Sequence, residues 1–365
     1  GYEHEIQRED VAHWLRNEPL SAKGTIRALA SRYVPGKPVG QYRYYGTRPD
    51  DPNDIIPHER RRELRALRVF AAWLNHDDAR SLNSIDAYVE EGGRHYIRHY
   101  LQDFGSNMGS GSTSAQQPRG GYEYLYEPGK IFRGILSFGL WRRDWMKVKF
   151  PDYPSVGNYE AESFEPARWK TEYPNPAFLR MDAADAFWAA RIVSRFTDEN
   201  IRALVARARL SHPEAAAYLT NTLIRRRDKA AAYWITRTNP LDRFDVLGRR
   251  GSRLELTFDN AAIRVGAARP GATYRVRWWA LDNLAGGEEL VGDETALPEA
   301  RVTVPEAAWG ARDDVGDRYA LAAIRTLHAD FPHWRRPVKV TLRDRGGQVG
   351  IVGITRPYDD PGPRP

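Results

Sequence analysis

The sequence predicts an α+β fold in which a mostly helical region precedes a small all-β sandwich. Three observations support this prediction. Apolar residues recur at helical spacing between residues 58 and 236, one alternating hairpin interrupts that region, and short alternating runs follow from about 245. We therefore divide the chain into four segments: 1–46, 47–244, 245–358 and a tail, 359–365.

The composition is that of a folded protein. Its 365 residues are 41% hydrophobic and suffice for two or three domains. No apolar run is long enough to predict a membrane span. Cysteine is absent, which excludes disulfides, thiolate metal sites and Cys nucleophiles. A Cys-free chain with many Trp and far more Arg than Lys favours a bacterial periplasmic or extracytoplasmic protein over a cytoplasmic one.

The net charge of +7 comes mostly from Arg on helical segments such as 59–68 and 223–229. Solvated helix faces are the simpler explanation of such charge runs. An anionic partner, such as phosphate groups, nucleic acid or a membrane surface, is the alternative. Because no nucleic-acid motif accompanies the charge, we expect no nucleic-acid partner.

Segment 1–46 is predicted to contain a helix over 8–17 and strands over 24–34 and 40–46. A loop follows, because three prolines break any period before residue 58. The next helix, over 58–75, has Arg and Glu on one face and apolar residues on the other: Leu64, Leu67, Phe70, Ala71 and Leu74.

A β-hairpin is predicted over 85–101, where two apolar alternations flank a turn at Glu90–Gly93. The Gly- and Ser-rich stretch 105–121 is expected to be mobile. An apolar helix over 129–141 and an irregular, Pro- and Tyr-rich stretch over 142–180 come next.

Three helices complete the helical region, over 183–196, after Thr197 and from Ser211 to about 236. Thr197 is an N-cap candidate, and Ser211 forms a capping box with Glu214. The strand-like runs that follow predict a sandwich of about 110 residues. Of Trp278 and Trp279 on one run, one should face the sandwich core; a carbohydrate platform is the less favoured alternative.

The stretch 76–83 reads HDDARSLN and joins the 58–75 helix to the hairpin, and the sequence DFG starts at Asp103, after the hairpin. The two outer ends of a hairpin lie side by side, so Asn83 and Asp103 should be neighbours, with Asp78 close by. Two carboxylates and an amide are oxygen ligands of the kind that Mg²⁺ prefers. The alternative is that these side chains only cap turns.

HDDARSLN resembles the catalytic loop of protein kinases, H-R-D-x-x-x-x-N, and DFG resembles their metal-binding motif. Aminoglycoside phosphotransferases have a similar layout. Residues 24–240 also resemble bacterial proteins of unassigned activity. The resemblance to kinases implies a kinase-like C-lobe over 47–244, with 1–46 as a remnant of N-lobe strands and hinge. It further implies ATP- and Mg²⁺-dependent phosphoryl transfer to a hydroxyl acceptor.

The resemblance implies a role for each matching residue. Asp78 corresponds to the base that accepts the hydroxyl proton, and Asn83 and Asp103 correspond to metal ligands. Arg80 occupies a position from which a cation neutralises the transferring phosphoryl group. His76 corresponds to a structural residue that supports the loop.

Other positions extend the pattern or depart from it. Tyr44 and Tyr45 fall in the hinge that contacts adenine. Asp77 replaces the usual Arg, so either adjacent aspartate is a candidate base, and the spacing favours Asp78. Ser110 and Ser112 are phosphoacceptor candidates, although a plain flexible loop is the simpler explanation.

Two features weaken the kinase interpretation. No G-x-G-x-x-G precedes the catalytic loop, and 1–46 is too short for a complete N-lobe. Because the chain also begins at Gly1 rather than Met, we expect a fragment completed by a missing N-terminal segment or a protein partner. The alternative is a pseudokinase, an inactive binding or structural subunit of a larger assembly. His95 and His99 lie over ~13 Å apart on the predicted strand, too far for one metal ion.

Overall fold

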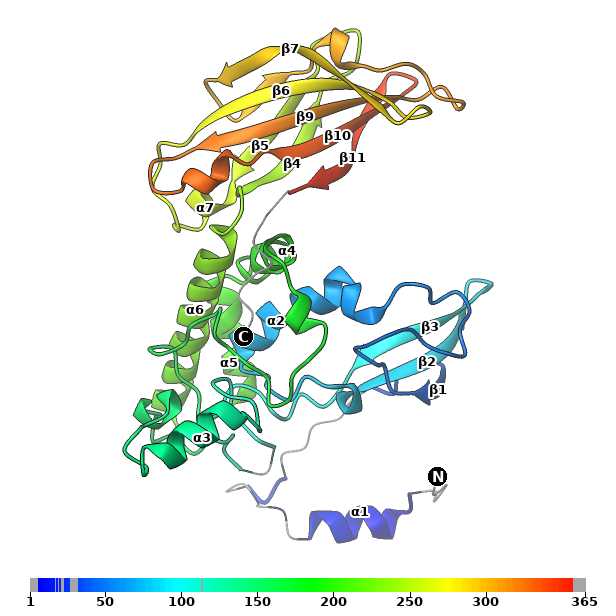
Figure 1. Cartoon of the computed structure of the whole chain (residues 1–365). Helices are drawn as coiled ribbons and strands as arrows, with labels where there is room; N and C mark the ends of the chain where they lie inside the picture. The colour runs from blue at the N-terminus through cyan, green and yellow to red at the C-terminus, as the bar shows by residue number, and fades with distance from the viewer. Residues whose placement is uncertain are drawn as a thin grey trace. The chain divides into compact units, whose positions relative to one another are not determined.

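The structure is a computed structural model that describes residues 6–16, 18, 20, 23–26, 32–112 and 114–356 (Figure 1). The described residues form seven α-helices and three antiparallel sheets, so the predicted α+β class is confirmed. None of the described helices is both long and apolar enough to cross a membrane.

Helices dominate before residue 240 and strands dominate after it (Figure 1). The α-helices are α1 (Arg8–Leu15), α2 (Arg62–Leu74), α3 (Pro128–Leu136), α4 (Ala183–Val193), α5 (Asp198–Ala208), α6 (Pro213–Ile235) and α7 (Ala261–Arg264). The strands are β1 (Lys37–Gly40), β2 (Ser84–Glu91), β3 (Arg94–Leu101), β4 (Leu241–Leu247), β5 (Glu255–Asn260), β6 (Thr273–Asp282), β7 (Gly287–Leu297), β8 (Arg301–Thr303), β9 (Arg318–Leu327), β10 (Val338–Arg345) and β11 (Gln348–Thr355).

The chain forms two compact units, one from residues 1–40 and 86–100 and the other from residues 41–85 and 101–365. The smaller unit holds most of the sheet β1-β2-β3. Its hairpin, β2 and β3, confirms the sequence prediction. Gly92 and Gly93 make the two-residue turn with φ angles of 58° and 73°, a conformation that glycine adopts without strain.

The strand predicted over 40–46 is not formed, and part of the other predicted strand, 24–34, lies outside the described residues. The backbone of Tyr42 instead bonds to the Ser84 side chain. The Ser84 hydroxyl accepts from the Tyr42 N–H (3.1 Å) and donates to its carbonyl (3.0 Å). A distant side chain thus takes the place of a neighbouring strand, and local alternation cannot reveal such a contact.

The helical core of the larger unit forms where α2, α4 and α6 pack together. The buried apolar residues of α2 follow the predicted helical spacing, although the α-helix proper begins only at Arg62. The largest side chains buried in this core include Tyr159, Phe187, Ile201, Trp234 and Ile235.

The starts of α5 and α6 test the predicted caps. Thr197 caps α5 as predicted, because its hydroxyl accepts the N–H of the third helical residue at 3.1 Å. The capping box predicted from Ser211 and Glu214 is wrong, since His212 is the N-cap of α6 and no side chain caps it. Pro213 opens the helix, a position where its missing N–H has no cost.

Two antiparallel sheets after residue 240 share one apolar core, which is the packing of a β-sandwich. One sheet has the order β11-β10-β9-β6-β7 and the other has the order β4-β5-β8. Strands β4, β7 and β8 were not predicted. Trp278 is buried in the core and Trp279 is half-buried, as alternation along β6 requires.

Within the larger unit, residues of the helical region and residues of the sandwich contact each other. The Asn239 amide donates to the carbonyls of Ile324 (3.1 Å) and Arg336 (2.9 Å). Trp334 has no exposed surface and belongs to the helical core, and its indole N–H donates to the Thr236 carbonyl at 3.0 Å. The helical region and the sandwich therefore share buried side chains.

Candidate functional site

The candidate site begins where α2 ends, at Asn75. Its left-handed backbone (φ 53°) is tolerated by Asn better than by most residues. The Asn75 amide nitrogen donates to Gln116 (2.8 Å), and its oxygen accepts from Trp169 (2.8 Å). A Cβ on Gly121 would lie 2.3 Å from that oxygen, so only glycine fits beside it. Buried contacts thus fix the direction in which the loop leaves α2.

His76 and Asp77 attach the loop to the residues that follow the hairpin. His76 Nδ1 lies 3.0 Å from the Ser106 carbonyl oxygen, and the His76 and Phe104 ring centroids are 5.5 Å apart. The Asp77 carboxylate accepts from the Ser106 hydroxyl (3.1 Å) and the Gln116 amide (2.5 Å). Burial raises the pKa of Asp77. Both side chains are therefore engaged in holding the loop.

Asp78, Arg80 and Asn83 come together in one turn. The Asn83 amide nitrogen donates to Oδ2 and to the backbone carbonyl of Asp78, both at 2.8 Å. Arg80 forms an ion pair with the other carboxylate oxygen, with Nε and Oδ1 2.6 Å apart. Because both hydrogen bonds use the amide nitrogen, the amide oxygen of Asn83 remains available to a donor or a cation. Of the two adjacent aspartates, Asp78 has the more accessible carboxylate.

Asp103 lies at the same end of the hairpin as Asn83. The Gln102 N–H donates to the Asn83 carbonyl at 3.0 Å, so the prediction that these segments are neighbours is confirmed. Asp103 is exposed with a φ of 56°, and its Oδ1 accepts from the Gly105 N–H at 3.2 Å. No hydrogen bond or ion pair joins Asp103 to Asp78 or Asn83, all of which are described. Its second carboxylate oxygen is therefore available.

These side chains offer a partial set of metal ligands. In the part of the chain that the structure describes, no three His, Asp or Glu side chains converge to hold a metal ion. The Asn83 amide oxygen and the Asp103 carboxylate are hard oxygen donors. Mg²⁺ commonly binds one or two protein oxygens together with substrate phosphates and water. The donors therefore fit a Mg²⁺ ion that arrives with a nucleotide better than a preformed, all-protein metal site.

The two tyrosines predicted to contact adenine have opposite environments. Tyr44 is buried, and its ring packs edge-on against Phe178 with centroids 6.4 Å apart. Burial raises the pKa of Tyr44 to about 12. Tyr45 exposes 65% of its surface. Tyr44 thus supports the core, and Tyr45 is the one of the pair that is accessible to solvent.

A small cavity of about 160 Å³ opens beside Asp78. Most of its charged lining residues are acidic, and they come from the loop and from three later positions: Asp77, Asp78, Arg119, Glu123 and Glu172. The stretch 105–121, expected to be mobile, contributes Gln116 and Arg119 to this wall. The Gly- and Ser-rich composition of this stretch predicted mobility. The Gln and the Arg within it were the only sign in the sequence that part of the stretch packs against the loop.

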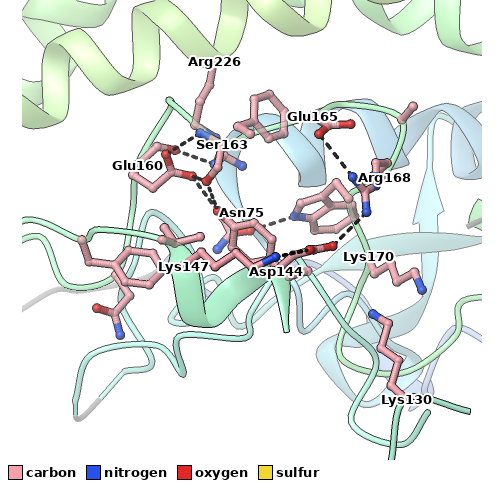
Figure 2. Close-up of a pocket in the computed structure, with 18 residues that line it drawn as sticks. Asn75, Lys130, Asp144, Lys147, Glu160, Ser163, Glu165, Arg168, Lys170 and Arg226 are labelled. Atoms are coloured by element: carbon pink, nitrogen blue, oxygen red, sulfur yellow. Dashed lines mark hydrogen bonds and ion pairs between the residues drawn. The ribbon is translucent and has the colours of Figure 1, made fainter. Parts of the chain in front are cut away.

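A larger cavity of about 520 Å³ lies next to Asn75 and Trp169 (Figure 2). Figure 2 shows Glu160 and Ser163 close together near Arg226, and Asp144 facing Arg168. None of the site residues predicted from the sequence lines this cavity. Its walls come largely from the irregular residues 144–170, whose lack of periodicity gave no sequence signal.

No family model, curated protein or solved structure matched the chain when it was compared with them. The kinase resemblance therefore stands on the loop 76–83, the DFG sequence and their geometry. A function for the site has to follow from the contacts described above.

Proposed function

We propose that the protein is a kinase-like phosphotransferase, with the loop 76–83 and Asp103 as its catalytic half. It transfers the γ-phosphoryl group of ATP to a hydroxyl acceptor in the presence of Mg²⁺. The observation that carries the proposal is the Asn83 amide, whose nitrogen bonds to Asp78 twice and whose oxygen is left for a cation. This orientation supports metal binding by Asn83 directly beside the proposed base.

Each residue has a defined task in this proposal. Asp78 accepts the proton of the acceptor's hydroxyl group. The hydroxyl oxygen forms a bond to the γ-phosphorus while the bond from that phosphorus to the ADP oxygen breaks. Asn83 and Asp103 would hold a Mg²⁺ ion, which would supply positive charge to the nucleotide phosphates. Arg80 exchanges its ion pair with Asp78 for the phosphoryl oxygens, which is feasible because a partly exposed ion pair is weak.

The nucleotide needs further contacts. Tyr45 is retained as a contact for adenine because its ring is accessible, whereas the buried Tyr44 is not. No G-x-G-x-x-G motif precedes His76 in the sequence. Activity therefore requires that a protein partner or additional N-terminal sequence supply the groups that grip the phosphates from the other side.

The test measures Mg-ATP binding by calorimetry and phosphoryl transfer from ATP. Asp103→Ala should abolish Mg²⁺-dependent nucleotide binding. Asp78→Asn should retain binding while transfer falls by about 10²–10⁴-fold, the usual contribution of a general base. Asp293→Ala, which changes an exposed aspartate on β7, is the matched control and should retain both properties. If the full-length protein, together with any partner that co-purifies with it, does not bind Mg-ATP, or if Asp103→Ala binds it equally well, the enzyme proposal is wrong.

The second candidate is a catalytically inactive, kinase-like binding or structural subunit of a larger assembly. The ion pair between Arg80 Nε and Asp78 Oδ1, 2.6 Å apart, favours this second candidate, because Arg80 neutralises the charge of the proposed base. The missing Gly-rich motif favours it too. Native mass spectrometry of the purified protein distinguishes the candidates: a stable partner without ATP chemistry supports the subunit, and a lone monomer that transfers phosphate contradicts it.

A further inference from the structure

The segment 128–149 presents apolar side chains to solvent. A surface helix ordinarily buries its apolar stripe, yet α3 has no buried residue. Phe138 and Leu140, just beyond the helix, expose 95% and 86% of their surface. We call the five most exposed apolar residues of this segment the apolar patch: Phe132, Ile135, Leu136, Phe138 and Leu140. Such a patch indicates a surface that something else covers.

The polar side of α3, rather than the apolar side, contacts the protein. Lys130 forms ion pairs with Glu123 (3.2 Å) and Glu127 (3.1 Å), whose carboxylates are largely buried. Successive residues of a helix are rotated by about 100° around its axis, so the apolar side chains of α3 fall within an arc of roughly 140°. These residues are Ile131, Phe132, Ile135 and Leu136. Lys130 lies opposite that arc, whereas Arg133 lies about 60° beyond its edge at Leu136. The helix is thus held by its charged face and leaves its apolar face outward.

Basic side chains border the apolar patch. Arg133, Arg142 and Lys149 are exposed, and none of them has a carboxylate partner among the residues that the structure describes. The Arg133 guanidinium lies 4.6 Å from the centre of the Trp141 ring. Between residues 128 and 149, Asp144 is the one acidic residue. The rim of the patch therefore carries positive charge that no carboxylate of the described residues neutralises.

We propose that segment 128–149 docks on the surface of an anionic lipid bilayer. The apolar patch enters the interface, and Arg133, Arg142 and Lys149 contact the headgroups. An apolar face of Phe, Leu and Ile beside Lys, Arg and Trp is the composition of helices that lie in a membrane interface. The nine residues of α3 are far fewer than the ~20 that span a bilayer, so the segment lies on the membrane.

Charge favours a lipid surface over a second copy of this chain. In a symmetric dimer the same patch meets itself, which would place the unpaired cations of both copies at one interface. An anionic bilayer instead neutralises all of them at once. The proposal does not depend on the phosphotransferase function, because none of the residues assigned to phosphoryl transfer belongs to the segment.

The binding test is co-sedimentation of the whole chain with vesicles. We expect binding to vesicles of equal parts phosphatidylcholine and phosphatidylglycerol, and much weaker binding to phosphatidylcholine alone. Binding should decrease as salt rises, because screening weakens attraction between exposed charges. Absence of binding to the anionic vesicles at low salt overturns the proposal.

Two double variants separate the apolar and ionic contributions. Phe138→Ser with Leu140→Ser, and Arg142→Glu with Lys149→Glu, should each lower binding at least about tenfold. The controls are Leu204→Ser on α5 and Arg249→Glu after β4, which change exposed residues elsewhere and should bind like wild type. Thermal unfolding should be unchanged in all four, because the altered side chains are exposed.

Equal binding by wild type and the serine double variant contradicts the proposal. Analytical ultracentrifugation provides a second contradictory outcome. If the protein is a dimer that Phe138→Ser with Leu140→Ser dissociates, the apolar patch belongs to a second copy of the chain and not to a lipid surface.

Discussion

Helices α2 and α3 have similar sequence patterns, but α2 buries its apolar face and α3 exposes it. Both place apolar residues at helical spacing beside basic ones. α2 buries its apolar face, where Ala66 and Val69 are almost completely inaccessible, whereas α3 buries no residue. The comparison shows that periodicity defines the faces of a helix without deciding which face the fold covers. That decision depends on what packs against the helix.

Polar contacts at the end of α2 reinforce this difference. The buried Arg226 guanidinium donates to the carbonyls of Trp73 (2.9 Å), Ala72 (2.5 Å) and Glu160 (2.8 Å). It also lies 3.8 Å from the centre of the Phe164 ring. Burial lowers the pKa of Arg226. The last turn of α2, which leads into the candidate site, is thus tied to α6.

The largest effect should come from removing this tie. Arg226→Ala removes three charge-assisted hydrogen bonds to buried carbonyl groups, although the carbonyls of Trp73 and Ala72 keep a second donor. We expect a loss of at least about 3 kcal/mol in the free energy of unfolding. Arg225→Ala is the matched control, because Arg225 is partly exposed and pairs with the exposed Glu162. Urea unfolding of both variants measures the difference. Similar stability of the two variants would show that α2 is held by apolar packing alone.

A pair of identical substitutions compares the two helices directly. Leu64→Ala on α2 removes a buried side chain and should cost about 2–3 kcal/mol of unfolding free energy. Leu136→Ala on α3 removes an exposed one and should change it by less than about 0.5 kcal/mol. The midpoint of urea unfolding measures both. A comparable loss in Leu136→Ala would mean that the apolar face of α3 is covered within the protein.

The smallest effect concerns the loop after α2 and depends on pH. Burial raises the folded-state pKa of Asp77 above its unfolded value of about 3.9. The native state therefore holds more protons between these two pKa values. The stability that the Asp77 carboxyl group contributes is complete below its unfolded-state pKa and is lost as pH rises through its folded-state pKa. The unfolding free energy of wild type relative to Asp77→Asn should thus fall as pH rises above the unfolded pKa of about 3.9.

Denaturant unfolding of both proteins at each pH tests this prediction, because the other ionisable groups are common to the two proteins. A difference that stays constant or grows with pH would show that the folded-state pKa of Asp77 is not raised.

Features that depend on near neighbours in the sequence were predictable. The spacing of apolar residues located α2, the hydroxyl of Thr197 located the start of α5, and paired glycines located the hairpin turn. Strand β7 was missed because it lies at a sheet edge, where exposed charged residues replace the usual alternation. The order of loop, hairpin and DFG predicted that the segments of Asn83 and Asp103 are neighbours, and the hydrogen bond from Gln102 to Asn83 confirms it.

The sequence by itself thus determined α2, the hairpin and the start of α5, and it predicted the loop 76–83 and Asp103 as a candidate site. The tertiary structure decided which of Asp77 and Asp78 is buried, why Tyr44 is inaccessible, and which face of α3 remains outside. The physical reason is that burial and hydrogen bonding in the site involve residues far apart in the chain. Asn75 with Gln116 and Trp169 is the clearest case. Such contacts leave no periodic trace in the sequence.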